Sequence, residues 1–123
     1  MLIGLGHDLQ PLEEFSRVEG LWAEDVFFTG RELEYIQRAR SPVESLAASF
    51  SSKESLFKAL PAVEGWYWTD AELLHDERHA PYFRFHGALG EQVERQAWQV
   101  KVSISHGGGF VSTVVIVAAA PRH

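Results

Sequence analysis

The segment from Phe50 to Lys58, Phe-Ser-Ser-Lys-Glu-Ser-Leu-Phe-Lys, is the feature that most constrains how this chain can fold. It lies in a predicted helix of about residues 43–60, which Ser41-Pro42 precedes and Pro61 ends. Lys53 falls on the apolar stripe of this helix, so we expect its stem to lie along the core and its ammonium group to reach a polar boundary. The stripe consists of Leu46, Phe50, Phe57 and Leu60.

Glu54 and Lys58 lie four residues apart on the same helix, beside the apolar stripe rather than opposite it. Two interpretations of this pair are open. It is either an ordinary helix-stabilising pair, worth ~0.2–0.5 kcal/mol, or a pair of charged groups that extends over the edge of a cleft.

The N-terminal residues 2–9 alternate in a way that predicts a strand. One face carries aliphatic side chains, and the other carries only Gly4, Gly6 and the carboxylate of Asp8. Glycine inside a strand often marks the close approach of another backbone or a ligand. Asp8 is therefore either a functional carboxylate or merely the end of the strand ahead of Pro11. The aliphatic face consists of Ile3, Leu5 and Leu9.

Three shorter helices are predicted around the long one. Pro11 begins the first, which Gly20 ends. Thr29 is an N-cap for the second, which continues through Arg40, and Glu32 completes a capping box. The third follows from a repeat of apolar residues every four positions: Leu89, Val93 and Ala97.

The remaining segments predict strands. The aromatic residues 66–68 indicate a strand or its approach, and the alternation at 82–86 after a polar turn indicates a hairpin. The alternating residues 100–106 are joined by three glycines to the apolar segment 110–120, which we expect to be a central strand covered on both faces. The predicted fold class is α+β, with helices packed against a mostly antiparallel sheet in one domain of residues 1–123.

Composition excludes several classes of function. The chain has 123 residues, a formal net charge of -6 and no cysteine. The acidic balance argues against nucleic acid and against an anionic membrane surface. The missing thiols exclude disulfides and thiolate metal sites, and no apolar run approaches the ~18 residues of a membrane span. We therefore expect a cytoplasmic protein.

Three separated motifs resemble a known family. The helix motif at 50–58, its companion Gly4-Leu5-Gly6-His7-Asp8 and the segment Val102-Ser103-Ile104-Ser105-His106 occur in the order typical of small 4'-phosphopantetheinyl transferases of the holo-[acyl-carrier-protein] synthase type. The step Phe28-Thr29-Gly30-Arg31-Glu32 is similar as well. The resemblance covers almost the whole chain and implies the fold of that family.

The resemblance implies a reaction and its residues. The phosphopantetheine arm of coenzyme A would move to a serine of an apo carrier protein, with release of adenosine 3',5'-bisphosphate. Mg²⁺ would be held by Asp8 and Glu54, which with Lys58 would form the catalytic set. The base that takes the serine proton stays open between a carboxylate and a bound water. The resemblance also implies a homotrimer with active sites between protomers and coenzyme A contacts from Lys53, Ser105 and His106. For Lys53 two roles are open, the neutralisation of phosphate and the shaping of the helix.

Several departures from the family pattern leave alternatives open. Ser45 and Ser49 occupy positions where the family often carries arginines. His7 could support Asp8, join a metal site with Asp8 and His106 as in a small hydrolase, or simply pack. A non-catalytic coenzyme A-binding or structural subunit is therefore the alternative function.

The surface expected to meet the carrier departs as well. Residues 12–40 hold four arginines against seven acidic residues, although the family usually offers acidic carriers a basic helix in this region. A carrier could still dock on a cluster of Arg31, Arg38 and Arg40. The pathway served, whether fatty acid or polyketide biosynthesis, is not predicted.

Overall fold

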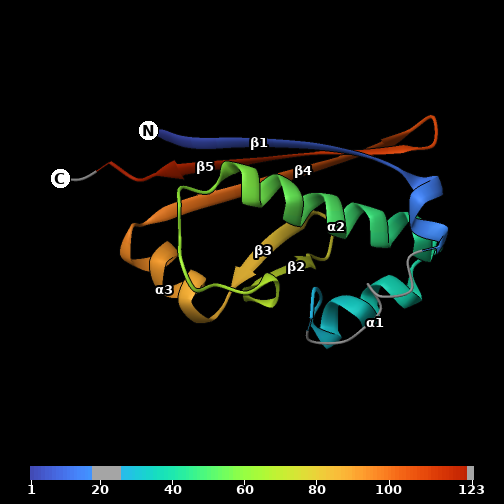
Figure 1. Ribbon diagram of the computed structural model, residues 1–123, viewed down its shortest axis with the longest axis horizontal. Helices are drawn as coiled ribbons and strands as arrows, with labels where there is room; N and C mark the ends of the chain where they lie inside the picture. Colours follow the sequence, from blue (N-terminus) through green and yellow to red (C-terminus); the bar gives the residue numbers. More distant parts are fainter. Residues whose placement is uncertain (18–25, 122–123) are drawn as a thin grey trace.

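The long helix α2 (Pro42–Ala59) lies between two antiparallel sheets in the computed structural model, which describes residues 1–17 and 26–121 (Figure 1). The first sheet has the strand order β1-β5-β4 and the second is the hairpin β2-β3. This arrangement confirms the predicted α+β class. The other elements, in chain order, are β1 (Leu2–Pro11), the 3-10 helix η1 (Leu12–Arg17), α1 (Gly30–Arg38), the 3-10 turn η3 (Trp68–Asp70), β2 (Ala71–His75), β3 (Pro81–Phe85), α3 (Gly87–Arg95), β4 (Trp98–Gly107) and β5 (Phe110–Ala119).

The two predicted glycines on β1 let α2 lie directly on the strand. A β-carbon added at Gly6 would lie 1.8 Å from the carbonyl oxygen of Ser55, and one at Gly4 would lie 1.7 Å from that of Ala59. Neither position can carry a side chain without moving the helix. The bare face of β1 therefore faces α2, and Asp8 on the same face lies at the helix surface.

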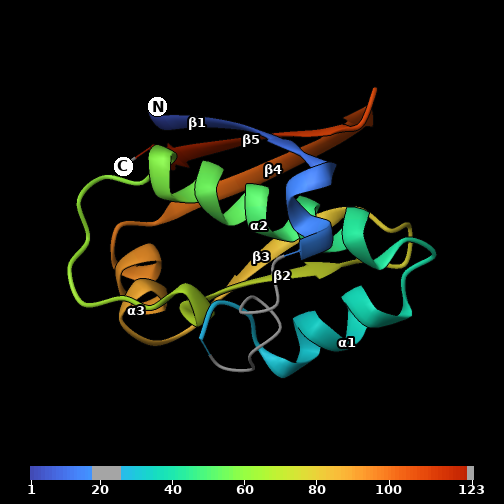
Figure 2. The same ribbon diagram turned by 45° about the vertical axis from the view of Figure 1, so that its right-hand side comes forward.

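Residues are buried on more than one side of α2, because the sheet covers one side and the β2-β3 hairpin and its approach lie on the other (Figure 2). Leu46 and Leu56 are fully buried, but Phe57 is 58% exposed. The predicted stripe was therefore wrong at Phe57. A stripe derived from helical periodicity assumes one buried face, which does not hold for a helix between two layers.

Most local predictions are confirmed. The Thr29–Glu32 capping box is present, and α2 agrees with the predicted helix within one residue at each end. Of the two predictions for residues 66–68, a strand or the approach to one, the second holds, since these residues lead through the η3 turn into β2 at Ala71. Ala97 lies beyond α3 with a φ of 52°. The predicted end of the first helix at Gly20 lies outside the described residues.

The three-stranded sheet is covered on one face only. β5 is the central strand as predicted, but Ile116 on its outer face is 41% exposed and Leu5, its partner on β1, is 60% exposed. No described element lies over this face in either ribbon view (Figures 1 and 2). The prediction that both faces of β5 are covered is therefore wrong for one chain. Among the described residues, no helix is long and apolar enough to cross a membrane.

Candidate functional site

Asp8 and Lys58 meet at the β1 edge of the sheet, although they are far apart in the sequence. The Lys58 ammonium group donates to Asp8 Oδ1 at 3.2 Å and to the His7 carbonyl oxygen at 3.0 Å. Gln10 Nε2 donates to the other Asp8 oxygen at 2.8 Å. Asp8 is almost fully buried, and the Lys58 side chain is half exposed. The site thus combines a fixed carboxylate with an ammonium group that solvent can reach.

Glu54 is the second carboxylate of this site. Burial raises its pKa, the negative charge of Asp8 raises it further, and Lys58 offsets part of the effect. No described residue donates a hydrogen bond to Glu54, in contrast to Asp8. Two carboxylates close enough to repel each other, one of them without a donor, form a site that a further cation would stabilise.

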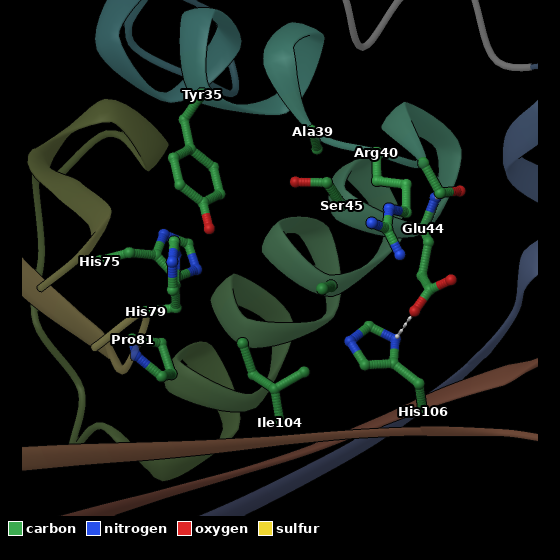
Figure 3. Close-up of a pocket in the computed structure, with 12 residues that line it drawn as sticks. Tyr35, Ala39, Arg40, Glu44, Ser45, His75, His79, Pro81, Ile104 and His106 are labelled. Atoms are coloured by element: carbon green, nitrogen blue, oxygen red, sulfur yellow. Dashed lines mark hydrogen bonds and ion pairs between the residues drawn. The ribbon is translucent and has the colours of Figure 1, made fainter. Parts of the chain in front are cut away.

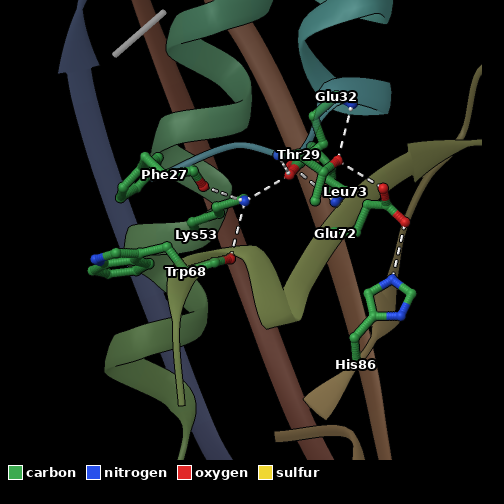
Figure 4. A network of polar contacts seen from close by, with 8 residues as sticks. All are labelled: Phe27, Thr29, Glu32, Lys53, Trp68, Glu72, Leu73 and His86. Carbon is green, nitrogen blue, oxygen red and sulfur yellow. Dashed lines mark hydrogen bonds and ion pairs between the residues drawn. The ribbon is translucent and has the colours of Figure 1, made fainter. Parts of the chain in front are cut away.

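Lys53 lies on the same helix but in the interior (Figure 4). Its ammonium group donates to Glu32 Oε1 at 2.8 Å and to the carbonyl oxygens of Phe27 at 2.7 Å and Trp68 at 3.1 Å. Burial lowers the pKa of Lys53 and raises that of Glu32, and each charge offsets part of the shift of the other.

Three donors therefore meet three acceptors, and the Lys53 side chain is 0% exposed. The expected contact of Lys53 with coenzyme A is incompatible with this burial. The ammonium group does not reach a polar boundary at the surface as predicted, because Glu32 supplies a partner inside the core.

The buried pair extends into a network that ties α1 to the hairpin (Figure 4). Glu32 Oε2 accepts from the Leu73 amide at 3.1 Å, Thr29 Oγ1 donates to Glu72 at 2.7 Å, and His86 Nε2 lies 3.0 Å from Glu72. Burial opposes the ionisation of Glu72, but its hydrogen bonds to Thr29 and His86 and the charges of His86 and Arg31 together outweigh burial and hold its pKa below the ordinary value. These contacts fix the N-terminus of α1 and with it the position of Phe27.

His106 lies at the end of β4, beside a cavity of about 390 Å³. Its Nδ1 is 3.0 Å from Glu44 Oε1 at the start of α2, and Arg40 lies nearby on the same side of the cavity (Figure 3). Ser45 also lines the cavity, whereas Ser49 is buried. This side of the cavity therefore offers Arg40 and His106, with Ser45 at a position where the resemblance led us to expect an arginine.

The far side of this cavity carries residues that the sequence did not single out. The ring of His75 stacks on Tyr35 with centroids 4.0 Å apart, and His79 lies beside them (Figure 3). Burial lowers the pKa of His75, and the nearby His79 lowers it further. No local pattern signalled these residues, because α1 supplies Tyr35 and the β2-β3 hairpin supplies the histidines.

Ser105 and His7 lie on the outer face of the sheet, away from α2. Ser105 pairs with Ser112 on β5, and His7 Nε2 is 3.0 Å from the Ser112 hydroxyl oxygen. His106 lies next to Ser105 on β4, but consecutive strand residues point to opposite faces. The side chains of Ser105 and His106 therefore lie on opposite faces of the sheet, although we expected them to act together. The His7 side chain contacts neither Asp8 nor His106.

The expected site residues fall on opposite edges of the sheet. Asp8 belongs to β1 and His106 to β4, and β5 separates the two strands. Glu54 and Lys58 accompany Asp8, whereas Glu44 and the cavity accompany His106. The two halves of the predicted site are thus separate within one chain.

Arg31, Arg38 and Arg40 line a second cavity, of about 590 Å³, beside α1. Arg38 forms an exposed ion pair with Glu34 at 2.9 Å. Tyr35, His75 and other residues line both cavities, so the two are adjacent. The arginine cluster predicted from the sequence therefore exists in space.

The described residues offer a metal ion pairs of carboxylates rather than larger ligand clusters. Within residues 1–17 and 26–121 no group of three His, Asp or Glu side chains could hold an ion. Asp8 and Glu54 offer hard oxygen ligands, which suit Mg²⁺, an ion that commonly completes its shell with water and phosphate oxygens. Asp8 and Glu54 are therefore the candidate ligands for a divalent ion at this edge of the sheet.

Comparison with known proteins gives a consistent result. The family model of the 4'-phosphopantetheinyl transferase superfamily matches residues 4–115. The chain is 37% identical over 122 residues to a holo-[acyl-carrier-protein] synthase of Streptomyces avermitilis, covering 94% of this chain and 96% of the relative. A synthase of the same name from Deinococcus deserti is 31% identical over 125 residues, covering 95% and 98% of the two chains.

Solved structures show the same fold. The crystal structure of a Neisseria meningitidis holo-[acyl-carrier-protein] synthase superposes with a TM-score of 0.80 at 25% identity, covering 96% of this chain and 99% of that one. A Helicobacter pylori synthase in complex with coenzyme A superposes with a TM-score of 0.74 at 23% identity, covering 93% and 99% of the two chains.

Proposed function

The chain belongs to the 4'-phosphopantetheinyl transferase superfamily and is an enzyme of its holo-[acyl-carrier-protein] synthase type, and from this premise we propose how its residues perform the transfer. The substrates are coenzyme A and an apo carrier protein, and the product released is adenosine 3',5'-bisphosphate. The observation that supports this most directly is the meeting of Asp8, Glu54 and Lys58 at one edge of the sheet.

Asp8 and Glu54 are the proposed ligands of Mg²⁺. Asp8 is held by Gln10 and Lys58, and the carboxylate of Glu54 lies near it with no hydrogen-bond donor among the described residues. When bound, the ion neutralises negative charge on the pyrophosphate of coenzyme A. Asp8 and Glu54 would hold the ion, and phosphate oxygens and water would supply its other ligands.

Lys58 is the proposed partner of the leaving group. The serine oxygen of the carrier forms a bond to the phosphorus attached to pantetheine, and the bond from that phosphorus to the bridging oxygen of the nucleotide breaks. The half-exposed Lys58 ammonium group can stabilise or protonate this oxygen. The serine proton leaves to a base that we do not assign.

The cavity beside His106 is the proposed site of the nucleotide end. Arg40 and His106 are its cationic or potentially cationic groups near α2, and Ser45 adds a hydroxyl group. Lys53 takes no part, because it is fully buried. Ser105 can contribute only through its backbone on this face.

We propose that a homotrimer completes the site. One chain presents Asp8 at one edge of the sheet and His106 at the other, so the edge of one protomer must meet the opposite edge of the next for both to contact one ligand. The uncovered outer face of the sheet supplies an apolar surface for such contacts, including Leu5 and Ile116. A monodisperse monomer in light scattering would contradict this assembly.

The arginine cluster beside α1 is the proposed contact for an acidic carrier. Arg31, Arg38 and Arg40 line one cavity, and this cavity is adjacent to the proposed nucleotide site. Such a cluster favours a partner with carboxylates on the surface that it presents.

Intact-mass spectrometry tests the proposed function. A panel of apo carrier proteins is incubated with the protein, coenzyme A and Mg²⁺, with EDTA and Glu54→Gln as controls. We expect a phosphopantetheine-sized mass gain on at least one carrier, and a loss of about a thousandfold or more in rate in both controls, since a divalent ion contributes several kcal/mol to such transition states. Asp8→Ala should behave like Glu54→Gln.

Two outcomes would overturn parts of this proposal. Near-normal turnover by Glu54→Gln, with its fold intact by circular dichroism, would contradict the metal assignment. Binding of coenzyme A without a mass gain on any carrier would favour the alternative of a non-catalytic binding subunit, with Ser45 and Ser49 as the first residues to examine.

A further inference from the structure

Three aromatic rings form an exposed cluster at the C-terminal half of α2. The centroids of Phe57 and Trp68 are 5.8 Å apart, those of Trp66 and Trp68 are 5.4 Å apart, and those of Phe57 and Trp66 are 6.4 Å apart. Phe57 is 58% exposed, and both tryptophans are partly exposed. We call these three residues the aromatic shelf. Exposed aromatic clusters of this kind usually mark a binding surface.

The shelf lies beside the catalytic carboxylate. Phe57 follows Glu54 by three residues on α2, which places the two side chains next to each other on the helix surface. Lys58 follows immediately, and its ammonium group reaches Asp8. If the phosphates of a ligand lie at Asp8 and Glu54, the group attached to those phosphates can therefore contact the shelf.

The shelf is anchored from inside the protein. Trp68 packs on Phe27 with centroids 4.6 Å apart, and its carbonyl oxygen accepts a hydrogen bond from Lys53 at 3.1 Å. Phe27 in turn stacks on Phe50 at 5.0 Å. A chain of rings thus connects the exposed surface to the core, so the shelf requires little ordering when a ligand binds.

We propose that the aromatic shelf holds the pantetheine arm of coenzyme A, an inference that rests on the proposed function. Coenzyme A extends in two directions from its pyrophosphate. The nucleotide end is assigned to the cavity beside His106, which lies at the other edge of the sheet and is separate from the shelf within one chain. The other direction is the pantetheine arm, whose dimethyl group, methylenes and planar amides suit packing on aromatic rings.

The shelf also contacts the part of the substrate that is transferred. The arm stays attached to the phosphorus that the carrier serine attacks, so rings that fix the arm also fix that phosphorus relative to Glu54 and Lys58. Phe57 would act as a positioning residue, and a thiol or thioester at the far end of the arm would extend beyond the rings.

Titration calorimetry with two ligands tests this inference. Coenzyme A carries the arm, and adenosine 3',5'-bisphosphate lacks it. We expect Phe57→Ser to weaken coenzyme A binding about tenfold and to leave the bisphosphate affinity unchanged. Phe57→Leu, which keeps an apolar side chain, should recover part of the affinity. Tyr67→Ser is the matched control. Tyr67 lies between the two tryptophans of the shelf and is 74% exposed, but it has no ring contact with the shelf.

Several results would overturn the inference. Equal weakening of both ligands would make Phe57 structural, and an unchanged coenzyme A affinity with a raised KM for the carrier would assign the shelf to the carrier. If the wild-type protein binds both ligands with the same affinity, the arm makes no contact with the shelf, although the nucleotide site stands. If it binds neither, the proposed function fails together with this inference.

Discussion

Helix α2 carries two lysines five residues apart, each paired with a carboxylate, and they differ in almost every physical respect. Lys53 is fully buried and has three acceptors for its three donors. Lys58 is half exposed, bonds Asp8 and one carbonyl oxygen, and lies beside Glu54, a carboxylate to which no residue in the described part of the chain donates. One helix thus contributes to a closed ion pair and to an open site.

Charge balance and solvent exposure distinguish the structural charges around Lys53 from the candidate functional charges around Lys58. In the inner group the charges balance and every polar hydrogen is used, so a ligand could only disrupt it. In the outer group two carboxylates face one ammonium group, and burial and repulsion both raise the pKa of Glu54. An unbalanced, partly solvated group can gain from a ligand, and that property distinguishes a binding site from a structural pair.

The largest expected effect on stability comes from the inner group. Lys53→Met leaves the Glu32 carboxylate buried without its partner, so we expect the free energy of unfolding to fall by about 3–5 kcal/mol in urea denaturation. Adding Glu32→Gln should recover part of this loss, because it removes the unpaired charge. Unchanged stability combined with lost coenzyme A binding would show that Lys53 acts as a ligand-binding residue after all.

A smaller free-energy change is expected at Lys58, and it should affect the rate of transfer. Lys58→Ala removes the ammonium group beside the leaving oxygen, so we expect transfer to slow about 100-fold while the dissociation constant of coenzyme A changes far less. Lys58→Arg, which keeps the charge, is the control. Weaker coenzyme A binding with a normal single-turnover rate would make Lys58 a binding residue only.

The smallest expected effect is the dependence of stability on Glu54 and pH. Because the pKa of Glu54 is raised on folding, its contribution to stability is fully present below the unfolded-state pKa and is lost as pH rises through the folded-state pKa. At neutral pH without Mg²⁺, Glu54→Gln should therefore stabilise the protein slightly, by less than about 1 kcal/mol.

Thermal unfolding across pH measures this effect. The stability difference between wild type and Glu54→Gln should vanish as the wild-type carboxyl group becomes protonated at acid pH. A destabilised Glu54→Gln protein at neutral pH would show that the ionised carboxylate is already compensated within the fold.

Sequence patterns predicted the fold where local physics decides the structure. The capping box at Thr29 and the prolines around α2 specify helix ends through backbone hydrogen bonds, and both predictions hold. Residues 66–68, predicted to be a strand or the approach to one, form the approach to β2, where Trp66 and Trp68 pack on Phe27 and Phe57 from outside the sheet. Aromatic content indicates a half-buried surface, and a loop over a helix offers one as well as a strand does.

The candidate site was predicted only in part, for a related reason. Asp8 lies on the glycine face of β1 as predicted, and the glycines on that face allow the α2 backbone to approach closely. Lys53 was expected to reach a polar boundary but is fully buried, and Phe57 was expected in the core but is exposed. Periodicity on a helix that is buried on two sides does not show which residue faces solvent. The opposite edges of Asp8 and His106 depend on strand order, which no local pattern encodes.

The close approach at Gly4 and Gly6 has a consequence for how this protein can vary. Because carbonyl oxygens of α2 occupy the space where β-carbons would lie, the separation between β1 and the helix is fixed by main chain rather than by side chains. Core side chains elsewhere can therefore be substituted without a change in the distance from Asp8 to Glu54. One added methyl group at Gly6 would instead move the carboxylates of Asp8 and Glu54 apart. The main-chain contact between β1 and α2 thus explains both why the core tolerates substitutions and why Gly4 and Gly6 do not.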